Sequence, residues 1–351
     1  MDKKMSKILV ILTGGTICSA QNENLKRQSD AEKAKNYIIA DFEESDSPFS
    51  KSLHFDTVSL KEDILSENMT VRVWNELLDI FRSVDWEKYK GIIVLHGTDT
   101  LAFTASLLSL ALCGAPLPVC LVSAQLPLRT PDGEKETRTN GYANFRTAAE
   151  LIMNGIAPNV YAVYRNMDGK MLLHYGAHLK QCPNYSNDFH SVDETELKDS
   201  NYKGLPSKKE NSFLEKLGAL TDCVMLITPY VGINYKRFCL DGVWAVVHGT
   251  YHSDTVCVER KKEEDDYTEY SILYLLDRCK ERDVPLFLAP CDEGAFAYDS
   301  TGDALRHGAM GIAGTTVELA YAKVLIGCSL GYKGDALTEF LKKNVNGEFV
   351  Y

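Results

Sequence analysis

Short apolar runs that alternate with helical patterns are the feature of this sequence that most constrains its fold. In the first half of the chain, four such runs are short enough for buried strands: Ile8–Leu12, Ile92–Leu95, Val119–Val122 and Val160–Tyr164. Apolar residues recur at helical spacing between them, as in Val73, Trp74, Leu77, Leu78 and Phe81. The alternation predicts an α/β fold in which a mostly parallel sheet is covered by helices on both faces.

The length of the chain predicts two domains. Its 351 residues exceed the roughly 150 residues of a typical domain about twofold. A polar stretch around residues 195–216 has the composition of an exposed connector, and further strand-like runs follow it at Val224–Thr228, Val243–Val247 and Pro285–Ala289, with a helical pattern at Tyr270–Lys280. We therefore predict an N-terminal catalytic α/β domain over residues 1–200, a linker over 201–218 and a smaller, Rossmann-like α/β domain over 219–351. No internal repeat is evident.

Charge and cysteine content narrow the possible partners and the compartment. The formal net charge of −11 repels polyanions, so we expect no nucleic-acid partner. The ten cysteines are scattered without a C-x-x-C pair, which is typical of reduced thiols in a cytoplasmic protein. The uncharged stretch Leu101–Ala124 approaches the length of a membrane span, but Gly114, Pro116 and Pro118 break it into a helix and a strand, so we expect no membrane association.

Two polar motifs directly follow predicted strands. Thr13-Gly14-Gly15-Thr16-Ile17 comes after the first run, and His96-Gly97-Thr98-Asp99-Thr100 comes after the second. Each motif alone is explained by a tight turn or a helix N-cap. Two of them at the carboxyl ends of parallel strands, where loops converge, instead favour a ligand site. Neither has the spacing of a phosphate-binding loop, so a nucleotide cofactor is not indicated.

Hydroxyl groups dominate both motifs, and this indicates nucleophilic chemistry. A threonine hydroxyl is a weak nucleophile at neutral pH and needs a neighbouring base to take its proton. Asp99 is a natural member of such a set, because a carboxylate orients a neighbouring lysine or threonine. His174 and His178 have the i, i+4 spacing of metal ligands, but no carboxylate or cysteine stands in register with them, so we expect no metal.

Taken together, Thr-Gly-Gly-Thr-Ile and His-Gly-Thr-Asp-Thr resemble the signature of the bacterial-type L-asparaginase family, and the chain is similar to its cytoplasmic type I branch. The resemblance implies that Thr16 is the nucleophile, which attacks the side-chain amide carbon and releases ammonia from an acyl-enzyme. It also implies that Thr98 is the second catalytic threonine and that the adjacent Asp99 binds the substrate α-ammonium group. Gly15 and Gly97 would bring backbone N–H groups to the substrate.

The resemblance also implies a lysine, a carboxylate-binding serine and a lid tyrosine. The segment from Asn166 to Lys180 resembles the family segment that ends in the catalytic lysine, which selects Lys180, with Lys170 as the weaker alternative. Ser66-Glu67-Asn68-Met69-Thr70 resembles the family's substrate-binding segment, so Ser66 would hold the α-carboxylate and Glu67 would face the α-ammonium; the same stretch also fits a simple helix N-terminus. Tyr37 would be the lid tyrosine, following a surface loop at 21–35, although a lone tyrosine in a loop is usually structural.

The activity implied by the resemblance is hydrolysis of L-asparagine to L-aspartate and ammonia without a cofactor, by a homodimer or homotetramer. Two alternatives stay open: a glutaminase or other small-amide hydrolase of the same fold, and a catalytically silent amino-acid sensor. One methylene separates asparagine from glutamine and is worth only about 1–3 kcal/mol in an apolar pocket, so the sequence does not choose between them.

Overall fold

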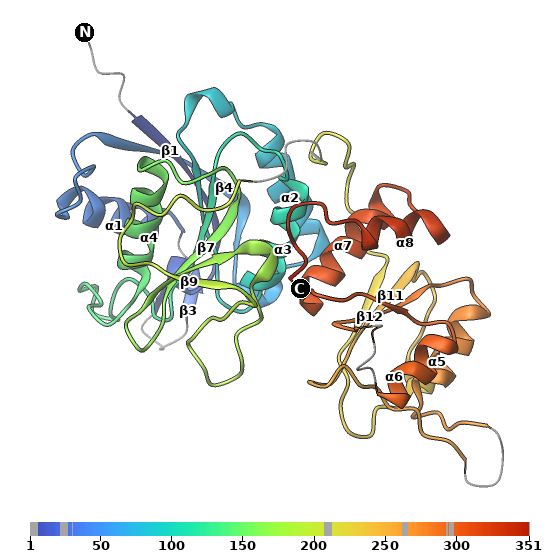
Figure 1. Ribbon diagram of the computed structural model, residues 1–351. Coiled ribbons are helices and arrows are strands. Elements are labelled where there is room, and N and C mark those ends of the chain that lie inside the picture. Colours follow the sequence, from blue (N-terminus) through green and yellow to red (C-terminus); the bar gives the residue numbers. More distant parts are fainter. Residues whose placement is uncertain are drawn as a thin grey trace. The chain divides into compact units, whose positions relative to one another are not determined.

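The computed structural model describes residues 6–21, 27–29, 31–206, 213–261, 266–292, 294 and 298–350 (Figure 1). The chain forms two compact units, Met1–Lys216 and Leu217–Tyr351. The division falls inside the stretch that the sequence predicts as a linker. Each unit is built around a sheet of its own.

The sheet of the N-terminal unit has seven strands. Their order is β4 (Leu53–Ile64), β1 (Ser6–Gly14), β5 (Ile92–Leu95), β6 (Val119–Val122), β7 (Val160–Arg165), β8 (Met171–Tyr175) and β9 (Glu194–Glu196). The strands from β4 to β7 are parallel, and β8 and β9 are antiparallel to their neighbours. The mostly parallel sheet is therefore confirmed, and the carboxyl ends of its parallel strands share one edge.

Helices cover both faces of this sheet (Figure 1). The helices are α1 (Ala31–Glu44), α2 (Val71–Arg82), α3 (Leu101–Ala111) and α4 (Gly141–Met153). Phe42 of α1 and Phe145 of α4 pack in one buried cluster with Leu12, Leu95 and Val122 of the strands. Because side chains alternate along a strand, the residues that follow those three turn to the opposite face.

Helix α2 shows why the sequence pattern predicted helices correctly. Thr70 caps its N-terminus by accepting a hydrogen bond from the Val73 backbone N–H at 3.4 Å. All five apolar residues on which the prediction rested are buried: Val73, Trp74, Leu77, Leu78 and Phe81. The Trp74 indole N–H also donates to the Thr104 hydroxyl of α3 at 3.0 Å, which ties the two helices together.

The C-terminal unit is a smaller four-stranded parallel sheet with helices. Its strands are β10 (Val224–Ile227), β11 (Ala245–Gly249), β12 (Leu286–Ala289) and β13 (Met310–Gly311), in that order. Its helices are α5 (Ile272–Lys280), α6 (Asp299–Arg306), α7 (Val317–Ser329) and α8 (Gly334–Lys342). The second α/β unit expected from the sequence is present.

Two parts of the N-terminal unit differ from the sequence-based expectation. The surface loop expected over residues 21–35 is wrong for residues 31–35, because helix α1 begins at Ala31. Residues 22–26 and 30 lie outside the described residues. Before it, β2 (Ser19–Gln21) and β3 (Arg27–Ser29) form an antiparallel pair. Strand β4 was also missed, because an edge strand tolerates charges such as Asp56, which pairs with Lys7 at 3.1 Å and Lys88 at 2.6 Å.

The uncharged stretch Leu101–Ala124 is confirmed as a helix followed by a strand, α3 and β6. Among the helices of the described residues, none has the length and hydropathy needed to cross a membrane. The ten cysteines are all free thiols, and seven of them are buried.

Candidate active site

Two glycine-containing turns meet at the carboxyl edge of the N-terminal sheet. Strands β1 and β5 are parallel neighbours, with Leu12 opposite Leu95, so the turns that follow them start side by side. Gly14 and Gly15 adopt φ angles of 109° and 82°, which favour glycine. A Cβ atom on Gly15 would lie 2.2 Å from the Cα atom of Gly97, so the two turns touch through their backbones. The expectation that both motifs form one site is consistent with this contact.

The four threonine hydroxyls of these turns fall into two classes. Thr13 Oγ1 donates to the Leu95 carbonyl at 2.9 Å, and Thr100 Oγ1 donates to the Ser66 carbonyl at 2.8 Å. Thr16 and Thr98 are half-buried, and within the described residues their hydroxyls bond to no protein group. Two hydroxyls thus hold the turns together, and two are available to a ligand.

Ser66 packs against the second turn. It begins a short 3₁₀ helix (Ser66–Asn68), is 4% exposed, and its Oγ donates to Asp99 Oδ2 at 3.1 Å while accepting from the Asp99 backbone N–H at 3.2 Å. A Cβ atom on Gly97 would lie only 2.4 Å from Ser66 Oγ. Ser66, Gly97 and Asp99 are therefore in direct contact, and the exposed Glu67 follows Ser66 in the chain.

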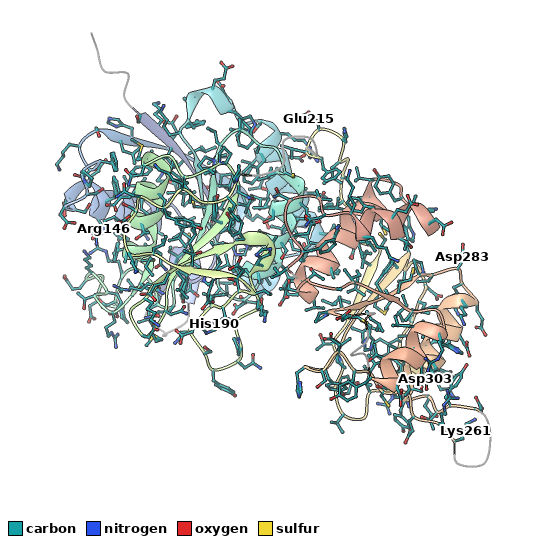
Figure 2. The ribbon with its side chains drawn as sticks, in the orientation of Figure 1. Arg146, His190, Glu215, Lys261, Asp283 and Asp303 are labelled. Atoms are coloured by element: carbon teal, nitrogen blue, oxygen red, sulfur yellow. The ribbon has the colours of Figure 1, made fainter. Side chains whose placement is uncertain are left out.

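Lys180 lies on the segment that returns to Asp99. Gly176 abuts helix α3, since a Cβ atom there would lie 2.9 Å from the Ala105 carbonyl. The chain then runs back towards the start of α3, where the Gln181 side-chain amide donates to the Asp99 carbonyl. The Lys180 backbone N–H donates at 3.0 Å to the carbonyl of His190, which is labelled in Figure 2. Lys180 is exposed and directly precedes Gln181, the residue that bonds to Asp99.

Lys170, the alternative lysine, occupies a different setting. It follows the turn between β7 and β8 and pairs with two carboxylates, Asp168 at 3.4 Å and Glu196 at 3.9 Å. Lys180 has no carboxylate within ion-pair distance among the described residues. Gln181 is a contact of the site that sequence reasoning missed; its position next to Lys180 was the available signal.

Tyr37 lies in helix α1 and not in a loop. Its ring is partly buried against the sheet core and is covered by the Arg129 guanidinium, 4.1 Å from the ring centroid. The hydroxyl of Tyr37 lies near Tyr142 of α4, whose pKa burial raises to about 12. These contacts explain Tyr37 as a packing residue, and its role as a lid tyrosine stays a prediction.

The histidines proposed as possible metal ligands are single buried groups. His174 is 0% exposed, and its Nδ1 lies 3.0 Å from Ser191 Oγ; burial lowers its pKa to about 4. His178 stacks obliquely on Tyr175, with ring centroids 5.7 Å apart. Throughout the described residues, no three histidine, cysteine, aspartate or glutamate side chains converge as a metal ion would require.

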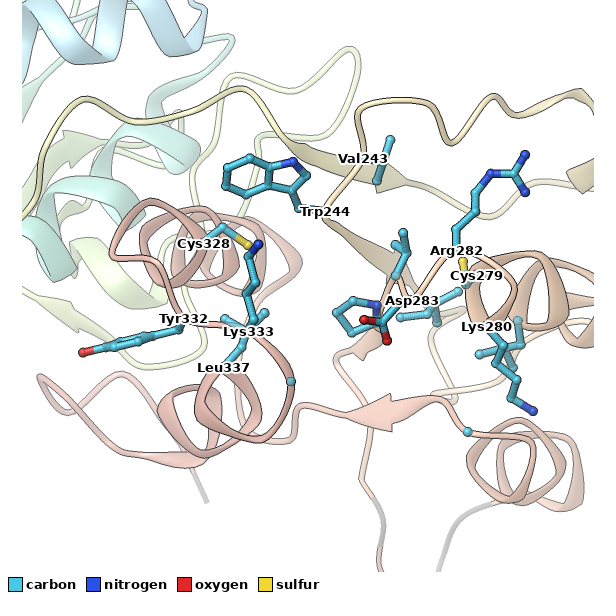
Figure 3. A pocket seen from close by; sticks show the side chains of 16 residues that line it. Val243, Trp244, Cys279, Lys280, Arg282, Asp283, Cys328, Tyr332, Lys333 and Leu337 are labelled. Carbon is cyan, nitrogen blue, oxygen red and sulfur yellow. The ribbon is translucent and has the colours of Figure 1, made fainter.

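A cavity of the described structure lies elsewhere, in the C-terminal unit (Figure 3). It has a volume of about 520 Å³, and its lining includes Val243 and Pro285, which precede β11 and β12. The cavity therefore lies at the amino ends of these parallel strands. In open parallel sheets, ligands instead bind at the opposite edge, beyond the carboxyl ends of the strands. The threonine turns do not line it.

One edge of the parallel sheet thus carries two threonine hydroxyls without a partner among the described residues, next to the Asp99 carboxylate of the second turn. Residues 7–206 match the family model described as "Asparaginase, N-terminal". Since this match covers more than half of the 351 residues, the chain belongs to the asparaginase family of amidohydrolases.

Known proteins of this family are similar to different extents of the chain. The L-asparaginase of Thermococcus kodakarensis is 31% identical over 167 residues, which are 47% of this chain and 45% of that protein. A glutamyl-tRNA(Gln) amidotransferase subunit of Methanosphaera stadtmanae is 24% identical over an alignment of 379 positions, covering 99% of this chain and 78% of that protein. The alignment with the T. kodakarensis L-asparaginase thus covers less than half of that protein.

Solved structures show the same fold over the whole length. The thermostable L-asparaginase from T. kodakarensis superposes with a TM-score of 0.75 at 21% identity, covering 98% of this chain and 99% of that one. L-asparaginase I from Vibrio cholerae superposes with a TM-score of 0.70 at 22% identity, covering 99% and 100%. A probable cytoplasmic L-asparaginase from Campylobacter jejuni gives 0.67 at 16% identity, covering 96% and 99%.

Proposed function

We propose that this protein is a threonine-dependent amidohydrolase that converts L-asparagine to L-aspartate and ammonia. The observation that carries the proposal is the division of the four threonines into two that brace the turns and two, Thr16 and Thr98, whose hydroxyls bond to no described protein group. A nucleophile and a proton-transfer group have to face the substrate, so their hydroxyls cannot be used up in the scaffold.

In this mechanism the Thr16 hydroxyl attacks the side-chain amide carbon. Its proton passes to the set formed by Thr98, Asp99 and Lys180 and then to the leaving ammonia, which leaves a β-aspartyl ester on Thr16. Water hydrolyses that ester and regenerates the threonine. Backbone N–H groups of the two turns, such as that of Thr98, stabilise the developing oxyanion, an interaction worth on the order of 3 kcal/mol per donor in other hydrolases. The N–H of Gly15 itself donates to the Ile64 carbonyl at 2.8 Å and is not one of these donors.

Recognition of the amino-acid end of the substrate falls to Ser66, Glu67 and Asp99 in this proposal. In this proposal the Ser66 hydroxyl gives up its hydrogen bond to Asp99 Oδ2 and donates to the α-carboxylate, while the carboxylates of Glu67 and Asp99 attract the α-ammonium group. The contact between Ser66 and Asp99 at 3.1 Å supports this assignment, because a hydroxyl and a carboxylate then lie side by side, as the two ends of an α-amino acid would need. We also propose a cytoplasmic homodimer or homotetramer that uses no cofactor.

Ammonia release by the purified protein tests this function. The wild-type protein is expected to release ammonia from L-asparagine, and Thr16→Ala is expected to abolish turnover while the circular dichroism spectrum stays unchanged. Thr250→Val serves as the matched control, because it removes a threonine hydroxyl that bonds to the Pro290 carbonyl at 2.7 Å in the other unit. Full activity of Thr16→Ala would refute the nucleophile.

A second candidate function is the use of glutamine as the amide donor. It is favoured by one observation, the alignment with an amidotransferase subunit over 99% of this chain. The ratio of kcat/KM for asparagine to that for glutamine decides between the two substrates. Binding of asparagine without any ammonia release would instead favour the catalytically silent sensor.

A further inference from the structure

His96 is the residue of the second turn to which the proposed mechanism gives no role. It directly follows β5, is 0% exposed, and its backbone N–H donates to the Val122 carbonyl at 2.9 Å. Its ring Nδ1 lies 2.7 Å from the Gly97 carbonyl oxygen. A carbonyl only accepts hydrogen bonds, so Nδ1 carries the proton, and a neutral ring then has its lone pair on Nε2.

This hydrogen bond fixes the peptide between Gly97 and Thr98. In a planar trans peptide, the carbonyl and the N–H of the following residue point in opposite directions. Since the Gly97 carbonyl turns to the buried ring, the Thr98 N–H turns away from it. Within the described residues this N–H has no acceptor, and it sits beside the free Thr98 hydroxyl.

The other ring nitrogen of His96, Nε2, belongs to a residue with a buried polar neighbour on the adjacent strand. Leu95 pairs with Val122 in the sheet, so His96 and Ser123 are register neighbours on the same face. Ser123 is also 0% exposed, and neither its Oγ nor His96 Nε2 has a partner among the described residues. Buried polar atoms rarely stay unpaired, so these two atoms are an exception within the described structure.

The C-terminal unit contains the same device in a closed form. His248 lies near the end of β11 and is 0% exposed; its Nδ1 lies 2.6 Å from the Gly249 carbonyl, and its Nε2 lies 2.8 Å from the Tyr235 hydroxyl. A buried histidine before a glycine thus orients the following peptide twice in this chain. The second case shows that Nε2 takes a hydroxyl partner.

We infer that His96 is a positioning residue that holds the Gly97–Thr98 peptide so that the Thr98 N–H points to the substrate. The inference rests on the proposed function, since it assigns the oriented N–H to the oxyanion of that reaction. His96 itself touches no reacting atom.

Two substitutions separate the two ring nitrogens. The amide nitrogen of His96→Asn falls near Nδ1 and can still donate to Gly97, whereas that of His96→Gln falls near Nε2 and cannot. We expect His96→Gln to lower kcat about 100-fold, the cost of a misplaced oxyanion donor, with KM changed less than about threefold. We expect His96→Asn to restore kcat at least about tenfold relative to His96→Gln, and His248→Gln, the matched control, to leave kcat unchanged.

A long-range ¹H–¹⁵N NMR spectrum of the histidine-labelled protein tests the inference without using activity. The expected result is a neutral His96 ring protonated at Nδ1 down to about pH 5, assigned by its loss in His96→Gln. Protonation at Nε2, or equal kcat values for the Asn and Gln variants, would overturn the positioning role. Absence of ammonia release from the wild-type protein would contradict the proposed function alone, because the NMR result still decides the state of His96.

Discussion

Two turns of this chain share the letters Val-x-His-Gly-Thr, and only one of them belongs to the candidate site. Residues 94–98 span the end of β5 and the turn after it in the N-terminal unit, and residues 246–250 lie at the end of β11 in the C-terminal unit. In both turns a buried histidine lies within 2.8 Å of the carbonyl of the following glycine. The sequence does not show this likeness as a repeat, because the match extends over five positions only.

The two turns differ in what becomes of the threonine. The Thr98 hydroxyl has no partner among the described residues, whereas the Thr250 hydroxyl donates to the Pro290 carbonyl at 2.7 Å. Asp99 follows Thr98 and bonds to Ser66, whereas Tyr251 follows Thr250 and its N–H closes a turn onto the Thr255 carbonyl. The same three residues, His-Gly-Thr, therefore end in a threonine hydroxyl that is bonded in one unit and has no partner among the described residues in the other.

The largest expected effect comes from replacing Thr98 and Thr250, each in a separate variant. Thr98→Ala should lower kcat about 10⁴-fold, because it removes a proton-transfer group from the site. Thr250→Ala should leave kcat within about twofold and lower the free energy of unfolding by about 1–3 kcal/mol, since the buried end of its hydrogen bond loses its donor. Steady-state kinetics and urea unfolding measure both. Equal losses of activity would erase the distinction between the turns.

The lysines give the next largest contrast. Lys180→Met should lower kcat about 10³-fold, because the proton-handling set loses its base. Lys170→Met should stay within about twofold of wild type, since Lys170 is an exposed partner of Asp168 and Glu196. If Lys170→Met causes the larger loss, the segment ending at Lys180 was assigned to the wrong lysine.

A fall in pH is expected to lower the free energy of unfolding to a similar extent through His96 and through His248. Burial lowers the pKa of both His96 and His248 to about 4, below the value near 6.5 of an unfolded chain. The unfolded state therefore binds more protons between these values, and each histidine costs up to about 3 kcal/mol of stability as the pH falls from about 6.5 to about 4.

Urea unfolding at about pH 7 and about pH 5 measures this dependence. His96→Asn and His248→Asn should each lose less stability than wild type between the two pH values, because each lacks one of the buried titrating rings. An unchanged difference in either variant would show that its histidine takes up protons in the folded state as readily as in the unfolded chain.

The glycines give the smallest and most local contrast. Gly97→Ala should lower the free energy of unfolding by about 1–3 kcal/mol and impair activity, because its Cβ would lie 2.4 Å from Ser66 Oγ. Gly249→Ala meets its nearest atom, Pro229 Cδ, at 3.3 Å and should change stability by less than about 1 kcal/mol. Thermal unfolding and kcat of both variants check this. Similar melting temperatures of the two variants would mean that the turn at Gly97 can shift to make room for the added methyl group.

Much of the fold could be predicted from the sequence because its signals are local. The four apolar runs of the N-terminal half are strands β1, β5, β6 and β7, since a parallel strand buried on both faces is continuously apolar. Strands β4 and β9 lie at the sheet edges and carry charged residues, so no such run marks them. Helix α1 was mistaken for a loop because its lysine, glutamate and asparagine residues were taken as typical of a surface loop.

By itself, the sequence determined that two hydroxyl-rich turns end buried strands, because apolar runs and glycines act within a few residues of each other. Only the tertiary structure decided which threonine hydroxyls lack a partner among the described residues, that Gln181 bonds to Asp99, and why Tyr37 packs under Arg129. The reason is that these partners lie far apart along the chain: Thr13 bonds to Leu95, 82 residues away, and Gln181 to Asp99 across the same interval. Sheet order and register bring them together, and no local pattern encodes either.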